Sequence, residues 1–350
     1  MTQSMSKLSI LTIGAGAIGS YVSGRLLASG NEVTFLEKAE VAPVLAQKGL
    51  TIHRENQMVR IESIEVTSSL HQALATKTYD LILVAIKAYD TPTLIKTLLP
   101  YKDQLPPILS LQNGVENEAL FRSAFGDNHV IAGTVTSAIA WKQIGEITIE
   151  KERGIGIAIE CELARHLSNA LQQAGFNVKN YTRPEDMKWS KLITNQLVNA
   201  SCAILDMPPV AVLSHPASFR LEMLQIRETL RVMEAYGIKV VDLPATPVRF
   251  LVWAIRVLPF WISQPLFIYF IGKGRGKKMP SLYLDFVAGR QQSEVDALNG
   301  AVVRFGEQAS LSTPVNRFLT QTLLDLIQGK IPRSTYEHSP HNLLQNCLLQ

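Results

Sequence analysis

The sequence LSILTIGAGAIG at residues 8–19 decides the fold of the first half of the chain. Its first six residues form a short, largely apolar run rich in β-branched side chains, and a turn with three glycines follows at once. Residues 21–28 then have helical periodicity and end near Gly30. A strand, a glycine turn and a helix in this order are typical of dinucleotide binding, because the glycines permit a tight turn, close approach of a pyrophosphate and close helix packing. We therefore expect the backbone of this turn and the helix N-terminus to hold a dinucleotide through Gly14, Ala15, Gly16, Ala17, Ile18 and Gly19.

The next expected strand, residues 32–38, ends in two opposite charges where dinucleotide-binding proteins read the adenosine ribose. Glu37 lies 23 positions after Gly14, close to the offset at which a carboxylate accepts the ribose 2′-hydroxyl of NAD. Lys38 has the charge to bind the 2′-phosphate of NADP. The local sequence therefore leaves the choice between NAD(H) and NADP(H) open, and leaves open that both residues are solvated turn charges.

Polar residues also follow two later apolar runs. The run that ends at Ile86 suits a central parallel strand and is followed by Lys87, and the run at 107–112 is followed by Asn113 and Gly114. In an open α/β sheet the carboxyl ends of the strands face the ligand crevice. Lys87 and Asn113 are therefore candidate ligand-binding residues, although Asn-Gly by itself is an ordinary turn signal.

The patterns predict two domains and a tail. Strands at 130–136, 144–150 and 154–159 and a helix at 163–174 extend an α/β domain to residue 182. Helical patterns then predict a mostly α-helical domain over residues 183–333. Its expected helices lie at 188–199, 216–236, 281–309 and 315–326. Residues 334–350 are polar, and we expect them to form a loose tail.

The stretch KWSKLITNQLVN at 188–199 carries the strongest candidates for chemistry in the second half. In one continuous helix Lys191, Asn195 and Asn199 lie four residues apart on a single face, and most other positions are apolar. A buried ammonium beside two carboxamides is costly unless a charged or polar partner meets it. The spacing alone leaves two interpretations open, a ligand site and an internally paired lysine with asparagines bonded to the backbone.

Residues 247–272 form an unusually apolar and aromatic segment, followed by basic residues 273–278. Its length suits a membrane span, but Arg249, Arg256, Pro259 and Pro265 interrupt it. Helices of the core or of a subunit interface are the favoured interpretation, contact with a membrane surface is the second, and a span is the least favoured.

The composition fits a soluble protein in a reducing cytoplasm. The 350 residues are 47% hydrophobic and 18% charged, and the formal charge of +4 has no extended basic stripe, so we expect no nucleic-acid partner. The three cysteines, Cys161, Cys202 and Cys347, lack disulfide or metal-ligand spacing, and we expect no metal. The first seven residues are polar and do not resemble a secretory signal. We therefore expect a cytoplasmic protein.

These motifs together resemble the ketopantoate reductase family over almost the whole chain. The resemblance rests on GAGAIG at 14–19, Lys87, LQNG at 111–114, KLITNQLVN at 191–199, and Ser281 followed by SEVDALNG at 293–300. It implies a Rossmann domain, a helical domain like the C-terminal domain of 6-phosphogluconate dehydrogenase, and NADPH-dependent reduction of 2-dehydropantoate to (R)-pantoate in pantothenate and coenzyme A biosynthesis. A homodimer through the helical domain is compatible with it.

The resemblance also implies roles for individual residues. Lys191 matches the general acid and Glu294 the acid paired with this lysine and with the cofactor ribose. The other matched residues bind ligands: Asn113, Asn195, Asn199 and Ser281 bind substrate, and Lys38, Lys87, Asn113 and Glu294 bind cofactor. This allocation suits hydride transfer to a 2-oxo carbon, because the carbonyl oxygen gains negative charge and needs a donor that can pass a proton.

The sequence departs from the family pattern in three places, which concern the substrate and the cofactor and not the reaction. Ala200 stands where a proline usually follows the last asparagine, and the Pro208-Pro209 pair stands near another substrate-side asparagine of the family. The segment 247–272 is bulkier than usual, and the Glu37-Lys38 pair is atypical of NADPH-dependent members. The alternatives are a reductase of a larger 2-oxoacid, and a non-catalytic NAD(P)-binding sensor at a membrane surface.

Overall fold

The computed structural model describes residues 7–55, 57–275 and 278–349, except for the side chains of 273–275. The chain divides into two compact units. The first unit contains Met1–Gln112, Glu116–Lys188 and Leu243–Thr246, and the second contains Asn113–Val115, Trp189–Asp242 and Pro247–Gln350. Each unit is described separately below.

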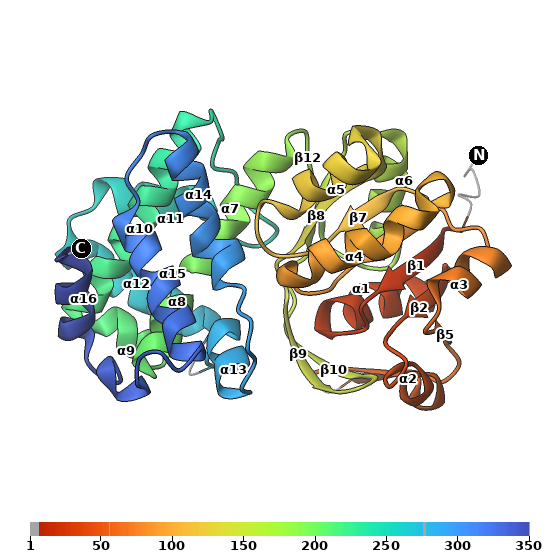
Figure 1. The fold of residues 1–350 in the computed structure, drawn as a ribbon, viewed down its shortest axis with the longest axis horizontal. Helices are drawn as coiled ribbons and strands as arrows, with labels where there is room; N and C mark the ends of the chain where they lie inside the picture. The colour runs from red at the N-terminus through yellow and green to blue at the C-terminus, as the bar shows by residue number, and fades with distance from the viewer. Residues whose placement is uncertain (1–6, 56, 276–277, 350) are drawn as a thin grey trace. The chain divides into compact units, whose positions relative to one another are not determined.

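The first unit is built on a large sheet with the strand order β12-β11-β8-β7-β6-β1-β2-β5 (Figure 1). Its strands are β1 (Ser9–Ile13), β2 (Glu32–Leu36), β5 (Glu65–Thr67), β6 (Leu81–Val84), β7 (Ile108–Ser110), β8 (Val130–Val135), β11 (Ile155–Ala158) and β12 (Val178–Tyr181). The six strands from β5 to β8 are parallel and have the 3-2-1-4-5-6 order of a Rossmann fold. The strand order reverses between β1 and β6, which is where such sheets bind dinucleotides.

Apolar helix faces cover both sides of this sheet. One core contains side chains of α1 (Ala17–Ala28) and α6 (Glu162–Gln173), and the other contains side chains of α3 (Leu70–Thr76), α4 (Thr91–Leu98) and α5 (Asn117–Phe125). A short helix, α2 (Ala42–Lys48), lies beside β5. The expected strands are continuous apolar runs because the sheet is buried on both faces, as in other parallel sheets.

A second, four-stranded sheet packs against α1. It has the order β4-β3-β10-β9, with β3 (Leu50–Arg54), β4 (Gln57–Ile61), β9 (Ala138–Gln143) and β10 (Glu146–Lys151). Of these strands the sequence analysis expected only the one near 144–150. The outer strand β4 is largely exposed, so it lacks the alternation of apolar and polar residues that marks a half-buried strand.

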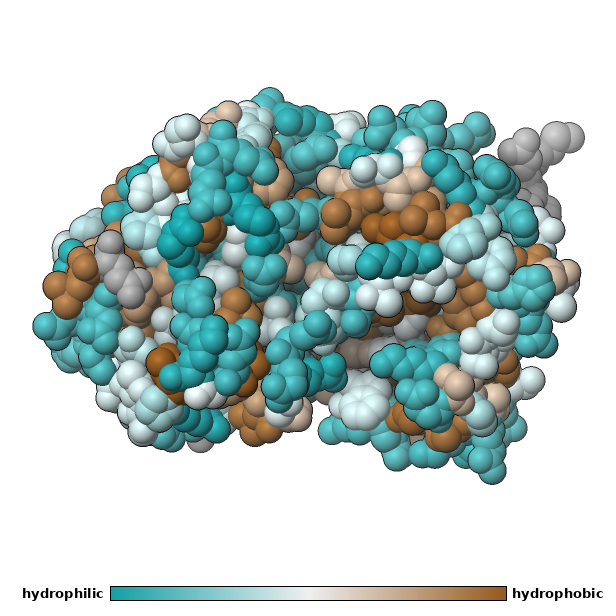
Figure 2. Space-filling model, in the orientation of Figure 1, coloured by the Kyte–Doolittle hydropathy of each residue, from teal (hydrophilic) through white to brown (hydrophobic). Residues whose placement is uncertain are grey.

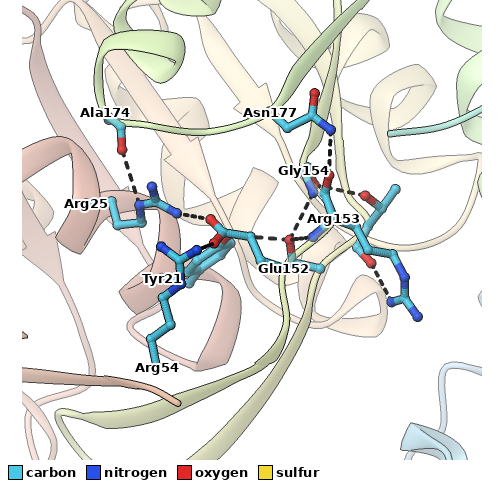
Figure 3. A network of polar contacts seen from close by, with 10 residues as sticks. Tyr21, Arg25, Arg54, Glu152, Arg153, Gly154, Ala174 and Asn177 are labelled. Atoms are coloured by element: carbon cyan, nitrogen blue, oxygen red, sulfur yellow. Dashed lines mark hydrogen bonds and ion pairs between the residues drawn. The ribbon is translucent and has the colours of Figure 1, made fainter. Parts of the chain in front are cut away.

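A polar cluster joins this small sheet to α1 (Figure 3). The carboxylate of Glu152 pairs with Arg25 of α1 and with Arg54 of β3, whose Nη2 lies 2.8 Å from Oε2. The hydroxyl of Tyr21, on α1, lies 3.4 Å from Glu152 Oε1. Burial, aided by the Glu152 charge, raises the pKa of Tyr21, so the phenol stays protonated and acts as a donor.

The second unit is helical. Its helices are α8 (Asn199–Leu205), α9 (Pro209–Ser214), α10 (Pro216–Ala235), α11 (Val248–Val257), α12 (Phe260–Arg275), α13 (Ser281–Val287), α14 (Ala301–Gln308), α15 (Pro314–Ile327) and α16 (Pro340–Leu348). Helix α7 (Pro184–Gln196) begins in the first unit and continues into the second. The Rossmann and all-α fold classes expected from the sequence are therefore confirmed.

Three helical expectations are wrong in detail. Residues 188–199 do not form one helix, because Leu197 and Val198 form a turn between α7 and α8. Residues 281–309 do not form one helix either: α13 ends at Val287, and a π-helical turn, Asp296–Gly300, precedes α14. The expected loose tail contains α16, which buries Leu343 and Cys347 against the unit.

The segment 247–272 forms α11 and most of α12, which are separated at Leu258 and Pro259. Within the part of the chain that the structure describes, no helix is both long enough and apolar enough to cross a membrane. On the face shown in Figure 2, hydrophilic residues cover most of the surface and apolar residues form separate groups.

Candidate active site

The glycine turn between β1 and α1 has the geometry of a phosphate cradle. Gly14 has φ = 97°, and a Cβ on Gly19 would lie 1.8 Å from the carbonyl oxygen of Gly14, so both positions need glycine for the turn itself. A Cβ on Gly16 would meet nothing within 4 Å. Gly16 is the N-cap of α1 and has no side-chain capping bond. The turn therefore leaves open space at a helix N-terminus, which fits a pyrophosphate.

The end of β2 places Glu37 against this turn. The backbone N–H of Ala15 donates to Glu37 Oε1, and the N–H of Lys38 donates to Oε2 over 3.2 Å. Both carboxylate oxygens are thus held at the position where the adenosine ribose is read. Lys38 is exposed, so its ammonium extends from the same strand end into solvent.

Lys87 and the residues before Asn113 come from neighbouring strand ends of the first unit. Lys87 follows β6 and is the N-cap of a short 3-10 helix, Ala88–Asp90. The amide of Gln112 donates to the carbonyls of Ile86 and Lys87, over 3.2 and 3.3 Å, and to Thr91 Oγ1 over 2.8 Å. Gln112, which the sequence analysis did not select, thereby fixes the loop that carries Lys87.

A buried ion pair supports the same loop. Lys188 and Glu118 are both almost fully buried, with Nζ 2.8 Å from Oε1. The ammonium also donates to the carbonyl of Gln112 over 2.6 Å and to that of Gly133 over 3.4 Å. Lys188 therefore holds the backbone immediately before Asn113. Helical spacing could not reveal this, because the partners of Lys188 lie 55 to 76 residues away in the sequence.

Within the second unit, Asn113 contacts Asn195, the second residue of the expected Lys191–Asn195–Asn199 row. Asn195 Nδ2 donates to Asn113 Oδ1 over 2.9 Å, and Lys191 lies one turn before Asn195 on α7. Lys191 and Asn195 are partly exposed, so the ammonium of Lys191 is not the fully buried group that its surroundings in sequence suggested. The structure thus brings Asn113 and Asn195 together, with Lys191 one turn earlier on the same helix.

Asn199 lies beyond a break in the helix. Val198 has φ = 55°, and its N–H donates to the buried carboxylate of Glu222 over 2.7 Å. Ser201 Oγ and Gln225 Nε2 donate to the same carboxylate. A carboxylate from α10 thus replaces the helical bond of Val198, a role with no local sequence signal.

Asn199 is nevertheless positioned near another expected residue. Its Oδ1 accepts the N–H of Leu282 over 3.1 Å, next to Ser281 at the start of α13. Glu294 is buried just before the π-helical turn. The structure therefore brings Asn199 beside the Ser281 backbone and places Glu294 in the same unit as Lys191.

One cluster of potential metal ligands occurs among the described residues. Asp206, Glu337 and His338 have ligand atoms within 4.8 Å of one another. Asp206 already pairs with Arg333, whose Nη2 lies 2.8 Å from Oδ2. We interpret the cluster as an ion pair beside α16 and assign it no metal.

Two family profiles match the two halves of the chain. The ketopantoate reductase PanE/ApbA profile matches residues 10–158, and the profile of the C-terminal domain of the same family matches residues 184–327. The chain belongs to the ketopantoate reductase family. Members of this family are nicotinamide-dependent oxidoreductases that act on a CH–OH group.

Individual relatives agree with this assignment. The chain is 25% identical to the 2-dehydropantoate 2-reductase of Halobacterium salinarum over 328 residues, which cover 91% of this chain and 97% of the relative. It is 24% identical to the enzyme of that name from Lactococcus lactis over 318 residues, covering 89% and 96%.

Solved structures share the fold of this ketopantoate reductase family member. A PanE/ApbA family ketopantoate reductase from Ralstonia eutropha has a TM-score of 0.76 and 26% identity, with 92% of this chain and 99% of that chain covered. A complex of D-mandelate dehydrogenase with NADH and anilino(oxo)acetate has a TM-score of 0.75 and 20% identity, with 91% and 99% covered. Because the identity is only 20%, the similarity to D-mandelate dehydrogenase shows the fold alone.

Proposed function

We propose that the chain reduces 2-dehydropantoate to (R)-pantoate with NADPH, and that Lys191 is the general acid. The observation that carries this proposal is the bond between Asn195 and Asn113, because it joins the Lys191 turn of α7 to the segment that follows β7. Asn195 and Asn113 are both amides, so they hold polar substrate groups without competing with Lys191 as acids.

A bound nicotinamide cofactor would supply the hydride for C2 of the oxoacid. The carbonyl oxygen then gains an electron pair, and the Lys191 ammonium passes a proton to it, which gives the 2-hydroxyacid. Asn195, Asn199 and Ser281 are proposed to hold the substrate carboxylate and hydroxyl. Glu294 is proposed to orient the ammonium of Lys191 and to bind the cofactor ribose. Lys87 is proposed to bind the nicotinamide end of the cofactor.

Steady-state kinetics of Lys191→Ala test the role of Lys191. We expect kcat to fall by roughly 10²–10⁴-fold, the usual contribution of a positioned acid, while the cofactor Kd stays unchanged. Lys142→Ala, an exposed lysine on β9, is the control and should keep wild-type kcat. Unchanged turnover in Lys191→Ala would remove this lysine from the mechanism.

The cofactor preference rests on the strand end at β2. Lys38 is proposed to bind the 2′-phosphate of NADPH. The geometry of Glu37, whose two oxygens accept N–H groups of Ala15 and Lys38, favours NADH as a second candidate, because this carboxylate repels a phosphate. Titrations of the wild type and of Glu37→Ala with NADH and NADPH distinguish the two cofactors. If Glu37→Ala leaves the preference between NADH and NADPH unchanged, Glu37 does not bind the ribose.

The substrate is tested with a panel of 2-oxoacids that have branched, long or aromatic side chains. Under the proposal, 2-dehydropantoate has the highest kcat/KM. A larger oxoacid is the second candidate, because Ala200 stands where the family usually has a proline and Pro208-Pro209 stands near a substrate-side asparagine of the family. NADPH binding without oxidation by any oxoacid would instead show that the chain only senses the cofactor.

A further inference from the structure

Helix α11 has one buried face and one exposed aromatic face. Val248, Val252 and Ile255, spaced by four and three residues, are buried. Phe250 and Trp253, spaced by three, are exposed on another side of the helix, and Trp253 is 47% exposed. A helix of a globular protein normally places polar residues on this outer side.

The exposed aromatic residues continue onto α12. The ring of Phe250 lies 5.7 Å from that of Trp253 and 5.9 Å from that of Phe270, and Phe270 lies 5.6 Å from Tyr269. Trp261, near the start of α12, is 77% exposed. We call these five exposed residues, Phe250, Trp253, Trp261, Tyr269 and Phe270, the aromatic face; α11 and α12 are labelled in Figure 1.

The inner side of α12 is firmly packed, so the aromatic face is the outer surface of an ordered element. Phe267 is buried, and its ring lies 5.9 Å from that of Phe219 on α10. Gln264 Nε2 donates to the carbonyls of Leu213 and Ser214, at the end of α9, over 2.9 and 3.1 Å. The aromatic side chains could not turn inward without breaking these contacts.

The net charge of residues 243–284, which include α11 and α12, indicates which kind of surface the aromatic face binds. Residues 243–284 contain six Lys and Arg and no Asp or Glu. The rest of the chain carries 28 Lys and Arg against 30 Asp and Glu. The segment therefore carries a formal charge of +6 and the rest of the chain −2, which together give +4. Arg249 and Arg256, both exposed on α11, belong to it, and Arg256 pairs with Glu234 of α10.

We propose that the aromatic face docks on the surface of a bilayer that contains anionic phospholipids. Trp and Tyr rings prefer the boundary between headgroups and acyl chains, and basic residues beside them are attracted to lipid phosphates. The helices lie in the plane of the interface, since neither is long and apolar enough to cross it. The enzyme thereby works at the membrane surface without being embedded in it.

A second copy of the chain fits this face less well. In a two-fold interface the same patch of each copy meets itself. The positive charge of residues 243–284, with six basic and no acidic residues in each copy, disfavours such self-pairing. An anionic bilayer supplies the opposite charge.

Vesicle sedimentation with the full chain tests the proposal. We expect the wild type to pellet with phosphatidylcholine–phosphatidylglycerol vesicles (3:1), to bind pure phosphatidylcholine weakly, and to lose binding in 0.5 M KCl. The Trp253→Ala/Trp261→Ala double variant should lose at least about tenfold in partition coefficient, because two aromatic side chains no longer leave water. Its reductase activity in solution should be unchanged, since neither tryptophan belongs to the catalytic machinery.

Trp141→Ala is the matched control, because Trp141 is 54% exposed on β9 and lies outside the aromatic face. It should bind vesicles like the wild type. Equal vesicle binding by the double variant and this control, or no binding of the wild type to the anionic vesicles, would overturn the proposal. A dimer in sedimentation velocity that dissociates only in the double variant would also overturn it and would assign the face to a second copy.

Discussion

Lys188 and Lys191 lie one turn apart on α7 and have different surroundings. Lys188 is 4% exposed and uses its ammonium on Glu118 and on two backbone carbonyls, whereas Lys191 is partly exposed. Only an accessible ammonium can meet a substrate. Lys188 is therefore committed to stabilising the fold, and Lys191, three residues later, stays the proposed acid.

Removing the Lys188 ammonium should destabilise the fold strongly. Lys188→Met leaves the buried Glu118 carboxylate without its cation, and we expect the free energy of unfolding to fall by about 3–5 kcal/mol. Urea unfolding followed by circular dichroism measures this. Lys191→Met, the same substitution one turn later, is the control and should cost about 1 kcal/mol or less, because Lys191 is partly exposed. Equal losses in the two variants would contradict the different roles.

The thiol of Cys347 on α16 should resist alkylation. Burial, together with the charge of Glu228, raises its pKa to about 12, so at pH 8 the thiolate is scarce. We expect iodoacetamide to modify Cys347 at least about a thousandfold more slowly than a free cysteine. Peptide mapping compares it with the partly exposed Cys161, and with unfolded protein, in which both should react. Modification of native Cys347 as fast as Cys161 would mean that α16 opens readily.

At the scale of elements, the sequence predicts helices better than it predicts where they break. The pattern at 188–199 is helical on both sides of Val198, and a valine with φ = 55° is not expected from local preference. The break is stabilised by Glu222, which lies 24 residues away and accepts the N–H of Val198. Such a bond depends on tertiary packing, so no spacing rule could place Asn199 on a separate helix.

A substitution in the glycine turn should weaken cofactor binding without destabilising the fold. In Gly16→Ala the new Cβ meets open space and the backbone φ of −72° suits alanine, so we expect an almost unchanged Tm. The same methyl group would occupy the space proposed for the pyrophosphate. Saturating NADPH at 100 times Kd should raise wild-type stability by about 2.7 kcal/mol and should stabilise Gly16→Ala far less.

Gly19→Ala is the contrasting variant, measured by the same thermal shift. Its Cβ would lie 1.8 Å from the Gly14 carbonyl oxygen, so we expect a lower Tm even without cofactor. If NADPH stabilises Gly16→Ala as much as the wild type, the pyrophosphate does not lie over this glycine.

At the scale of the whole molecule, the sequence predicted both fold classes because their patterns are strong: buried parallel strands give continuous apolar runs, and helices give a 3.6-residue period. It did not predict the sheet formed by β3, β4, β9 and β10 as a unit, since β3 pairs with β10, 95 residues later, and β4 is mostly exposed. The same limit applies to the site. Asn113 and Asn195 were selected from separate motifs. Gln112 lies in the LQNG motif but was not selected, and Glu118 and Glu222 act through long-range contacts with no motif.

We expect the ion cluster around Glu152 to stabilise the packing of the four-stranded sheet against α1. In Glu152→Gln, Arg25 and Arg54 lose their shared anion (Figure 3). Arg25 is only 17% exposed, whereas Arg54 is 52% exposed and well screened, so we expect the free energy of unfolding to fall by about 2 kcal/mol, less than for a fully buried pair.

Glu62→Gln is the matched control for this loss. Glu62 pairs with Arg60 over 3.7 Å on the exposed end of β4, with side-chain exposures of 80% and 60%. Water screens that pair, so the same substitution should change stability by less than about 0.5 kcal/mol in the same urea titration. A similar small change in Glu152→Gln would show that the small sheet is held to α1 by its apolar contacts alone, with Ile147, Ile149 and Ile52 packed into the core that α1 shares.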